Sequence, residues 1–384
     1  MKTKLRMVQA SLLAALSLGG FACSAADTGG FSNTTGGDSY PAVTVTTLSQ
    51  LESAVNSGQH HIIVSGTLYG GSGLTTLTFS SANNNNTTIE GAAGGKAALE
   101  NIQLKFDGEL LASGTNIQNI KVSNLTFFGK ISDLQAMPQQ VYGSSDSTKK
   151  VGINYEGISL RRVTNALITH CAIYDTSDDL MSVALSSDNV TLSYNHLYFS
   201  DSWVNMSPDP VWNWVGYNTD LAGERLAMVV GANTSDSWQG TGKLHVTLHH
   251  NWIGPNVRGR PLFRGWIHAY SNYFDNSETY SGTDYNTATD GNKYPKQQYE
   301  ALQLVNGSVV YSESNYFLKT NNTNTLTNDG SSYTDKFYEK NNTYSGTTGT
   351  SATGTTFSSP VSYSYSVTAS ASVPAYVMAN AGPK

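Results

Sequence analysis

The stretch LHVTLHHNWIGPNVRGRPLFRGWIHAYSNYFDN, residues 244–276, contains two short β-prone runs that both end in asparagine. The runs VTLHHN and IHAYSN end at Asn251 and Asn272, 21 residues apart. A short strand motif that recurs with one asparagine position predicts a repeat architecture. The same position recurs elsewhere along the chain, at Asn124, Cys171 (in LITHC), Asn195 and Asn315.

The spacing of these positions decides between two all-β folds. Successive steps are 47, 24, 56, 21 and 43 residues, close to one or two units of about 22 with one insertion of roughly ten. Units this short cannot bury their own apolar faces, so they must stack. Asparagine at one turn can bond both the backbone there and the next asparagine. The pattern favours a parallel β-helix (solenoid) over an antiparallel sandwich with asparagine in its hairpin turns.

Two further features complete the expected architecture. The segment TTLSQLESAVNSG, residues 46–58, carries Leu48, Leu51 and Val55 at helical spacing and ends at Gly58. This helix is expected to cap the open N-terminal end of the stack, where strand edges would otherwise be exposed. Residues 201–224 and 276–300 interrupt the repeat and are expected to form long lateral loops, which are more often functional than idle.

The N-terminus is typical of an export signal. Three basic residues precede an apolar run from about residue 7 to 18, and small residues follow. We therefore expect a signal peptide over 1–26, a flexible linker over 27–39 and one β-helix domain over 40–384. Cys23 offers the alternative of a lipid anchor. The apolar run is too short for a membrane span, so a secreted protein is predicted.

Charge restricts the ligands that the protein can bind. The 384-residue chain has a formal net charge of −6 and 13% charged residues. A broad basic surface for nucleic acid is therefore not expected. Three of its seven arginines nevertheless fall within seven residues, in NVRGRPLFRG over 256–265. Clustered guanidinium groups repel one another unless an anionic ligand relieves the repulsion, so this segment is the candidate anion site.

The segment 244–276 also resembles the signature of the pectate lyase family, polysaccharide lyase family 1. There a His-His-Asn-aromatic strand end precedes an Arg-x-Pro-x-x-Arg segment and a second Asn-ended strand. Residues 43–68, 85–100, 157–175 and 362–384 resemble further parts of the family, so the resemblance covers about 40–384. It implies a single-stranded right-handed parallel β-helix that cleaves polygalacturonate by β-elimination, as a monomer.

The resemblance also implies catalytic residues. The chemistry needs a base for the C5 proton of a uronate and positive charge to stabilise the carbanion. The family's first arginine falls two residues before Pro261, where this chain has Gly259. Arg258 or Arg260 would then be the base, with Gly259 permitting a bulge, and Arg264 would clamp a carboxylate.

Calcium and substrate residues follow from the same resemblance. Calcium bridging acidic side chains and a substrate carboxylate is expected at DTSDDLMSV, residues 175–183. Asp178 would be one ligand, aided by Asp175 or Asp179, although Ser182 stands where another acid is usual. Three residues are candidates for substrate binding. Arg225 lies beside Leu226, the position where the family has a lysine, and Trp203 and Trp212 belong to the 201–224 insertion.

Three other functions remain open at this stage. A lyase for methyl-esterified pectin that works without calcium would suit Ser182 and the tryptophan-rich insertion. A β-helix glycoside hydrolase would use paired acids, but its motifs are missing. A non-catalytic polysaccharide-binding solenoid would follow if the shifted arginines were inert. An unsaturated, ultraviolet-absorbing product marks elimination and separates the lyases from the other two.

Overall fold

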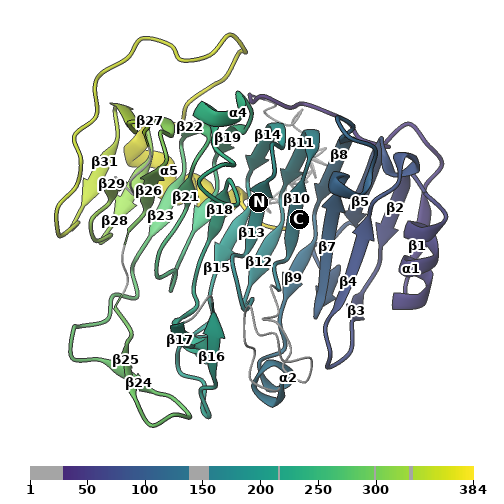
Figure 1. Cartoon of the computed structure of the whole chain (residues 1–384), viewed down its shortest axis with the longest axis horizontal. Coiled ribbons are helices and arrows are strands. Elements are labelled where there is room, and N and C mark those ends of the chain that lie inside the picture. The colour runs from purple at the N-terminus through teal and green to yellow at the C-terminus, as the bar shows by residue number, and fades with distance from the viewer. Residues whose placement is uncertain (1–28, 138–154, 215–216, 298–299, 328–331) are drawn as a thin grey trace, which may run out of the picture.

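The computed structural model describes residues 29–137, 155–214, 217–297, 300–327 and 332–384. The expected signal peptide, Cys23 included, lies outside these residues. Within them the chain winds through three parallel sheets that run the length of the molecule (Figure 1). Every helix in the described part of the chain is too short or too polar to cross a bilayer.

Each turn of the winding contributes one strand to each sheet, in a repeating order. Ten strands form sheet A, namely β1 (Val43–Val45), β2 (His61–Val64), β5 (Thr87–Gly91), β8 (Ile117–Ser123), β11 (Val163–Thr169), β14 (Asp188–Ser193), β19 (His245–His249), β22 (Trp266–Tyr270), β27 (Val309–Glu313) and β30 (Lys336–Lys340). Nine form sheet B, namely β3 (Thr67–Tyr69), β6 (Ala98–Glu100), β9 (Thr126–Phe128), β12 (Ala172–Tyr174), β15 (His196–Tyr198), β20 (Trp252–Ile253), β23 (Tyr273–Asp275), β28 (Tyr316–Leu318) and β31 (Thr343–Ser345). Eight form sheet C, namely β4 (Thr75–Phe79), β7 (Ile102–Asp107), β10 (Ile158–Arg161), β13 (Met181–Ala184), β18 (Met228–Val230), β21 (Leu262–Phe263), β26 (Leu302–Val305) and β29 (Asn324–Thr327).

The strand pairing confirms the predicted parallel β-helix. Neighbouring strands of each long sheet run parallel, and in-register partners stack like on like, as in Ile168 on Leu192 and Leu192 on Leu248. These inward-facing side chains form one continuous buried core. The core therefore grows by one layer per turn, which is how a short repeat buries apolar surface.

A row of buried asparagines joins sheets A and B at one corner. Asn195 donates from its backbone N–H and side-chain amide to Oδ1 of Asn251, at 3.0 and 3.1 Å. Asn251 repeats this with Asn272, at 3.0 and 2.9 Å, and Asn272 with Asn315. Cys171 extends the row through its N–H, at 3.0 Å from Asn195 Oδ1. The predicted stacking of these residues is confirmed.

Asn124 was expected in this row, but it lies one residue before it. Its φ of 58° is the left-handed conformation that Tyr194 and His250 adopt just before their ladder asparagines. Ala172 N–H bonds to the carbonyl of Leu125, as His196 N–H does to Cys171, so Leu125 is the residue in register. The residue with the left-handed conformation directly precedes the residue of the asparagine row, and asparagine suits either position.

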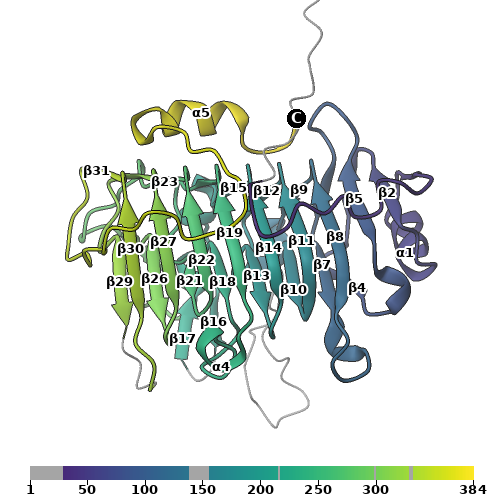
Figure 2. The same ribbon diagram turned by 90° about the horizontal axis from the view of Figure 1, so that it is seen from above.

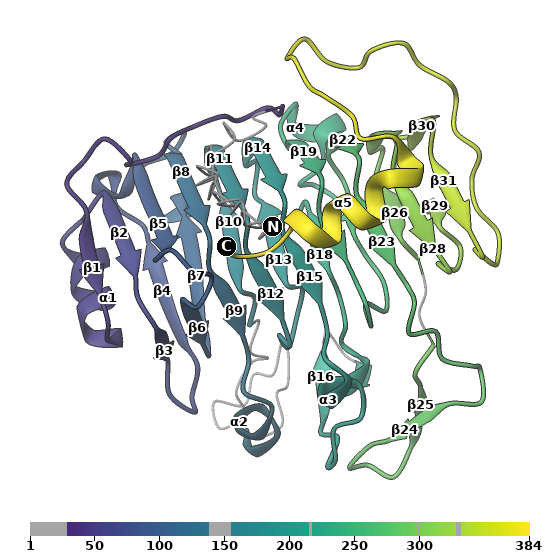
Figure 3. The same cartoon turned by 180° about the vertical axis from the view of Figure 1, so that it is seen from behind.

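The expected cap helix is α1, Leu48–Asn56, which buries Leu51, Ala54 and Val55 at the first end of the stack (Figure 1). Thr47 caps its N-terminus and Gly58 follows in a left-handed conformation. At the other end of the chain, α5 (Val373–Asn380) lies over sheet B (Figure 3). There Val373 and Val377 pack on a group of side chains, namely Trp252, Tyr273, Tyr316 and Leu318.

The lateral insertions all project from one edge of the solenoid, between sheets B and C (Figures 1 and 3). They carry two short helices, α2 (Ile131–Ala136) and α3 (Asp201–Val204). They also carry two antiparallel hairpins, β16–β17 (Val211–Trp214 and Tyr217–Asp220) and β24–β25 (Tyr285–Thr287 and Lys293–Pro295). A further short helix, α4 (Trp238–Thr241), lies between sheets C and A in the chain. The predicted long lateral loops are therefore present and gather on one side.

Residues 29–39 pack along the outside of sheet A rather than forming the expected flexible linker (Figure 2). Ser32 is buried, with its N–H 2.9 Å from Thr191 Oγ1, and Phe31 packs edge-on against Trp266. The glycines that suggested flexibility permit close approach. A Cβ on Gly30 would collide with Thr191 Oγ1, and one on Gly37 would collide with a backbone oxygen.

The asparagine row should contribute strongly to stability. Asn251→Ala removes two donated and two accepted hydrogen bonds and leaves buried partners unsatisfied, so we expect the free energy of unfolding to fall by about 2–4 kcal/mol. Denaturant unfolding followed by circular dichroism measures the change. Asn83→Ala, at an exposed position, should cost less than about 0.5 kcal/mol. Equal losses in the two variants would contradict the role assigned to the row.

Candidate active site

The candidate site lies in the turns that lead into successive strands of sheet C. Glu156 precedes β10, Asp178 and Asp179 precede β13, Glu224 precedes β18, and Arg258 precedes β21. Register pairing of Ser159 with Ser182, and of Leu226 with Gly259, places these turns directly beside one another. Rungs of a parallel sheet lie about 4.8 Å apart. Residues far apart in sequence therefore come together at the edge that carries the insertions.

Arg260 and Asp179 form the central ion pair of the site. Arg260 Nη1 donates to Asp179 Oδ2, and Asp179 is 2% exposed. The other oxygen, Asp179 Oδ1, is buried without a hydrogen-bond partner among the described residues. Burial opposes the charge on Arg260, but Asp179, Asp178 and Glu224 outweigh it and raise the pKa of this guanidinium. Arg260 therefore holds its proton and acts as a fixed cation.

Glu156 is a site residue that sequence reasoning missed. Its carboxylate accepts a hydrogen bond from Ser182 Oγ at 2.5 Å, and Ser182 in turn lies 2.9 Å from Ser159 Oγ. Burial, followed by the charge of Asp178, raises the pKa of Glu156 to about 7. Glu156 thus brings an acid from the neighbouring rung next to Ser182, the position where the resemblance implies an acid. Aligning YEGISL with DDLMSV as repeat units would have revealed it.

Asp178 lies beside Glu156 and is half-buried, and its removal from solvent raises the pKa of its carboxyl. Its Oδ1 accepts the N–H of Asp179 at 2.8 Å. Asp175, the third predicted metal ligand, is occupied elsewhere. Its two oxygens accept the N–H and the hydroxyl of Ser200, at 2.8 and 2.6 Å, at the start of α3. Glu156, Asp178 and Asp179, and not Asp175, are therefore the carboxylates that the fold brings together.

The three clustered arginines do not converge on one point. Arg258 Nη1 donates to the carbonyl of Gly223 at 3.0 Å, and Arg260 binds Asp179. Arg264 follows β21 instead of preceding it, and donates to Asn306 Oδ1 and Gly231 O, both at 2.7 Å. In a fully extended segment Arg258, Arg260 and Arg264 would point to the same side, but Arg260 adopts a left-handed φ of 62°. The chain therefore turns at Arg260, and not at Gly259.

The three residues expected to bind substrate are all buried. Trp203 and Trp212 are 0% exposed and belong to the core, so neither presents a face for a sugar ring. Arg225 is also 0% exposed and donates to the carbonyls of Ala222 and Lys296, at 3.0 and 2.8 Å. It joins the two lateral insertions to each other. Trp203 and Trp212 of 201–224, and Arg225 directly after it, therefore fix the insertion in place, because its apolar groups need a core of their own.

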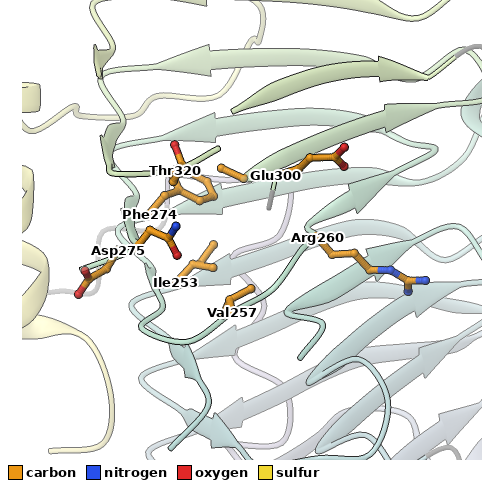
Figure 4. A pocket seen from close by; sticks show the side chains of 9 residues that line it. Ile253, Val257, Arg260, Phe274, Asp275, Glu300 and Thr320 are labelled. Carbon is orange, nitrogen blue, oxygen red and sulfur yellow. The ribbon is translucent and has the colours of Figure 1, made fainter. Parts of the chain in front are cut away.

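The two positions where the family carries cations pair with each other beside open space. Leu226 and Gly259 form a parallel bridge, and a Cβ built on Gly259 meets nothing within 4 Å. A small pocket lies next to this opening (Figure 4). Arg260 and Glu300 line it together with the apolar side chains of Ile253 and Phe274. The site thus combines an acidic cluster, two guanidinium groups and an accessible cleft edge.

The fold and the charged cluster beside sheet C define the class of protein as a β-helix protein with a polar site on its lateral edge. Similar proteins narrow this class. Residues 215–384 match the family model described as pectate lyase. Among curated proteins, pectate trisaccharide-lyase from Bacillus licheniformis is 25% identical over 257 residues, which are 61% of this chain and 68% of that protein. Pectate lyase 1 from Juniperus ashei is 29% identical over 122 residues, which are 31% of this chain and 26% of that protein.

Solved structures share the fold over nearly the whole chain. Pectate lyase II from Xanthomonas campestris matches with a TM-score of 0.59 and 22% identity, covering 92% of this chain and 97% of that one. A pectate lyase from Bacillus sp. N165, solved in complex with trigalacturonate, matches with a TM-score of 0.59 and 18% identity, covering 92% and 98%. The family match covers residues 215–384, and the described chain has the fold of these solved pectate lyases.

The carboxyl cluster predicts how stability depends on pH. The pKa of Glu156 rises on folding from 4.5 to about 7. A carboxyl with a raised folded-state pKa binds its proton more tightly when folded, so stability is lost as pH rises from about 4.5 to about 7. Glu156→Gln removes this loss.

Denaturant unfolding without divalent cations should therefore show a flatter decline across this window for the Glu156→Gln variant than for the wild type. Glu52→Gln, at a half-exposed position on α1, is the control and should follow the wild-type profile. If Glu156→Gln follows it as well, the assignment of Glu156 as a buried, proton-holding carboxyl is wrong.

Proposed function

We propose that the protein is an exported polysaccharide lyase that cleaves polygalacturonate by β-elimination. The observation that carries this proposal is the site itself, where buried carboxylates and fixed guanidinium groups meet at the open edge of sheet C. Binding a polymer with one carboxylate per sugar requires positive charge at the cleft, which an acidic chain supplies at few places. The family match over residues 215–384 supports the same reaction.

Arg258 is the cation best placed to meet a substrate carboxylate. One of its nitrogens is bound to Gly223 O, which fixes the guanidinium beside the open position of Gly259. A guanidinium presents several donors in a planar fork that matches a carboxylate. Charge held there would stabilise the negative charge that develops on the uronate when its C5 proton leaves. Arg260, neutralised by Asp179, keeps the acidic cluster together, and Arg264 organises the far end of β21.

The acidic cluster fits calcium. Burial, followed by the charge of Asp178, raises the pKa of Glu156, so a cation bound between the two carboxylates would offset their repulsion. Carboxylate and hydroxyl oxygens are ligands of the kind that calcium prefers. The described residues do not form a complete three-acid set by themselves. Glu156, Asp178 and Ser182 would hold the ion, which when bound would neutralise a substrate carboxylate.

Polygalacturonate turnover tests the proposed function. The purified protein should generate an unsaturated, ultraviolet-absorbing product from polygalacturonate, and less from highly methyl-esterified pectin, because an ester lacks the charge that Arg258 binds. Arg258→Ala should lower kcat/KM by about tenfold or more, because it removes a charged hydrogen bond to the substrate carboxylate. Lys243→Ala, which changes a half-exposed cation on another face of the solenoid, is the control. Absence of any unsaturated product from both polymers would refute the lyase.

Calcium binding can be tested without turnover. Isothermal titration calorimetry of the wild type with calcium should show a site that Asp178→Asn weakens by about tenfold or more. Glu156→Gln should do the same, whereas Asp290→Asn, on an exposed loop, should leave it unchanged. Wild-type and Asp178→Asn titrations that coincide would exclude this cluster as the calcium site.

Export can be tested separately. Mass spectrometry of the protein from its native host should show a mature N-terminus near residue 26, as the sequence pattern predicts. A lipid-modified Cys23 would instead indicate an anchored form.

A further inference from the structure

At the position of the family's first arginine this chain has Gly259, so another group must accept the proton. Arg260 is held protonated by its carboxylate neighbours, and a guanidinium gives up its proton only at very high pH. The acceptor must be a group with a free lone pair at the open part of the cleft. Among the described residues, the four carboxylates of the site differ in whether they already accept a hydrogen bond from the protein.

Three of the four carboxylates are committed to protein donors. Glu156 accepts from Ser182, Asp178 accepts the N–H of Asp179, and Asp179 is bound by Arg260. The fourth, Glu224, is half-exposed, and its carboxylate makes no hydrogen bond to the described residues. A partly exposed carboxylate without a protein donor can accept a proton from a bound substrate, whereas Glu156 and Asp179 are buried and already accept protein hydrogen bonds.

The backbone fixes Glu224 next to Arg258. Glu224 ends the short 3-10 turn Leu221–Gly223, with its N–H bonded to Leu221 O at 3.1 Å. Arg258 contacts the residues on both sides of it, because its guanidinium donates to Gly223 O and its backbone N–H donates to Arg225 O at 2.8 Å. Two residues further on, Leu226 pairs with Gly259, where the cleft is open. Carboxylate, guanidinium and open space therefore occur together.

The charged groups around Glu224 suit this role. Burial, followed by Asp178, raises the pKa of Glu224 to about 7, while Arg258 and Arg260 oppose the rise and Asp220 adds to it. A general base works best when its pKa is near the working pH. Glu224 is then largely ionised just above neutrality and still basic enough to hold the proton it receives.

Building on the proposed lyase activity, we propose that Glu224 is the catalytic base, which takes the C5 proton of the uronate while Arg258 holds that sugar's carboxylate. The electron pair of the C5–H bond forms the C4–C5 double bond. The C4–O bond to the next sugar breaks, and its oxygen leaves with a proton from solvent. Glu224 then returns its proton to water. No oxidant or reductant is involved, and the products are an unsaturated uronide and a free 4-hydroxyl end.

The experiment compares Glu224→Gln with the wild type on polygalacturonate. We expect kcat to fall by roughly 10²–10⁴ with KM little changed, and Glu224→Asp to restore part of the rate. The wild-type kcat/KM should rise with pH through about 7, and the residual rate of Glu224→Gln should lack this step. Unfolding midpoints and calcium titrations equal to the wild type show that fold and cation site are intact. Glu52→Gln, on the remote helix α1, serves as the control.

The possible failures can be told apart. If the wild type is active and Glu224→Gln keeps its kcat within about threefold of it, Glu224 is not the base, and the proposed function stands. If Arg258→Ala instead loses kcat by the larger factor while Glu224→Gln does not, an arginine is the base. If the wild type makes no unsaturated product from polygalacturonate or pectin, the proposed function fails, and the base assignment with it.

Discussion

The hydrogen-bonded row from Asn195 to Asn315 is the constraint on which the other features depend. Each buried amide needs donors and acceptors at the right height, and it finds them only when the turns above and below are in register. A slip by one residue would leave several polar groups buried and unpaired. Because the row fixes register at the corner between sheets A and B, it also fixes it where sheet B passes to sheet C. The strands around the candidate site are therefore aligned by hydrogen bonds at a corner that lies outside the site.

The sequence predicted those parts of the fold that repeat or that have local signals. The asparagine spacing indicated the stack, and Leu51, Val55 and Gly58 indicated the cap helix. Prediction from the sequence failed where the role of a residue depends on a contact with a distant part of the chain. Gly30 and Gly37 resemble linker glycines, yet they permit backbone contact with sheet A. Composition alone cannot distinguish a glycine that is free to move from one that must be small.

The sequence predicted where the site lies, but it did not predict which side chains bind one another there. The arginine cluster pointed to the correct turn, yet Arg258 binds Gly223 on the neighbouring rung and Arg260 binds Asp179 two rungs away. Arg225 binds Lys296 in the other lateral insertion. Those pairings depend on parallel register, which brings side chains tens of residues apart to adjacent positions. The same register brings in Glu156 and Glu224, which have no local motif. Arginines that the sequence predicted to bind an anionic ligand therefore bind carboxylates and carbonyl oxygens within the solenoid instead.

The packing of residues 29–32 has a consequence for the order in which the molecule can be completed. Gly29 O accepts the hydroxyl of Tyr270, and Phe31 packs against Tyr363 in the C-terminal tail. Tyr363 is synthesised long after Phe31, so this contact can form only when the C-terminal tail is available. Thr191 and Tyr270, the hydrogen-bond partners of Ser32 and Gly29, are synthesised earlier. The outer face of sheet A is thus covered by segments from both ends of the chain, and its last contacts join the beginning of the polypeptide to its end.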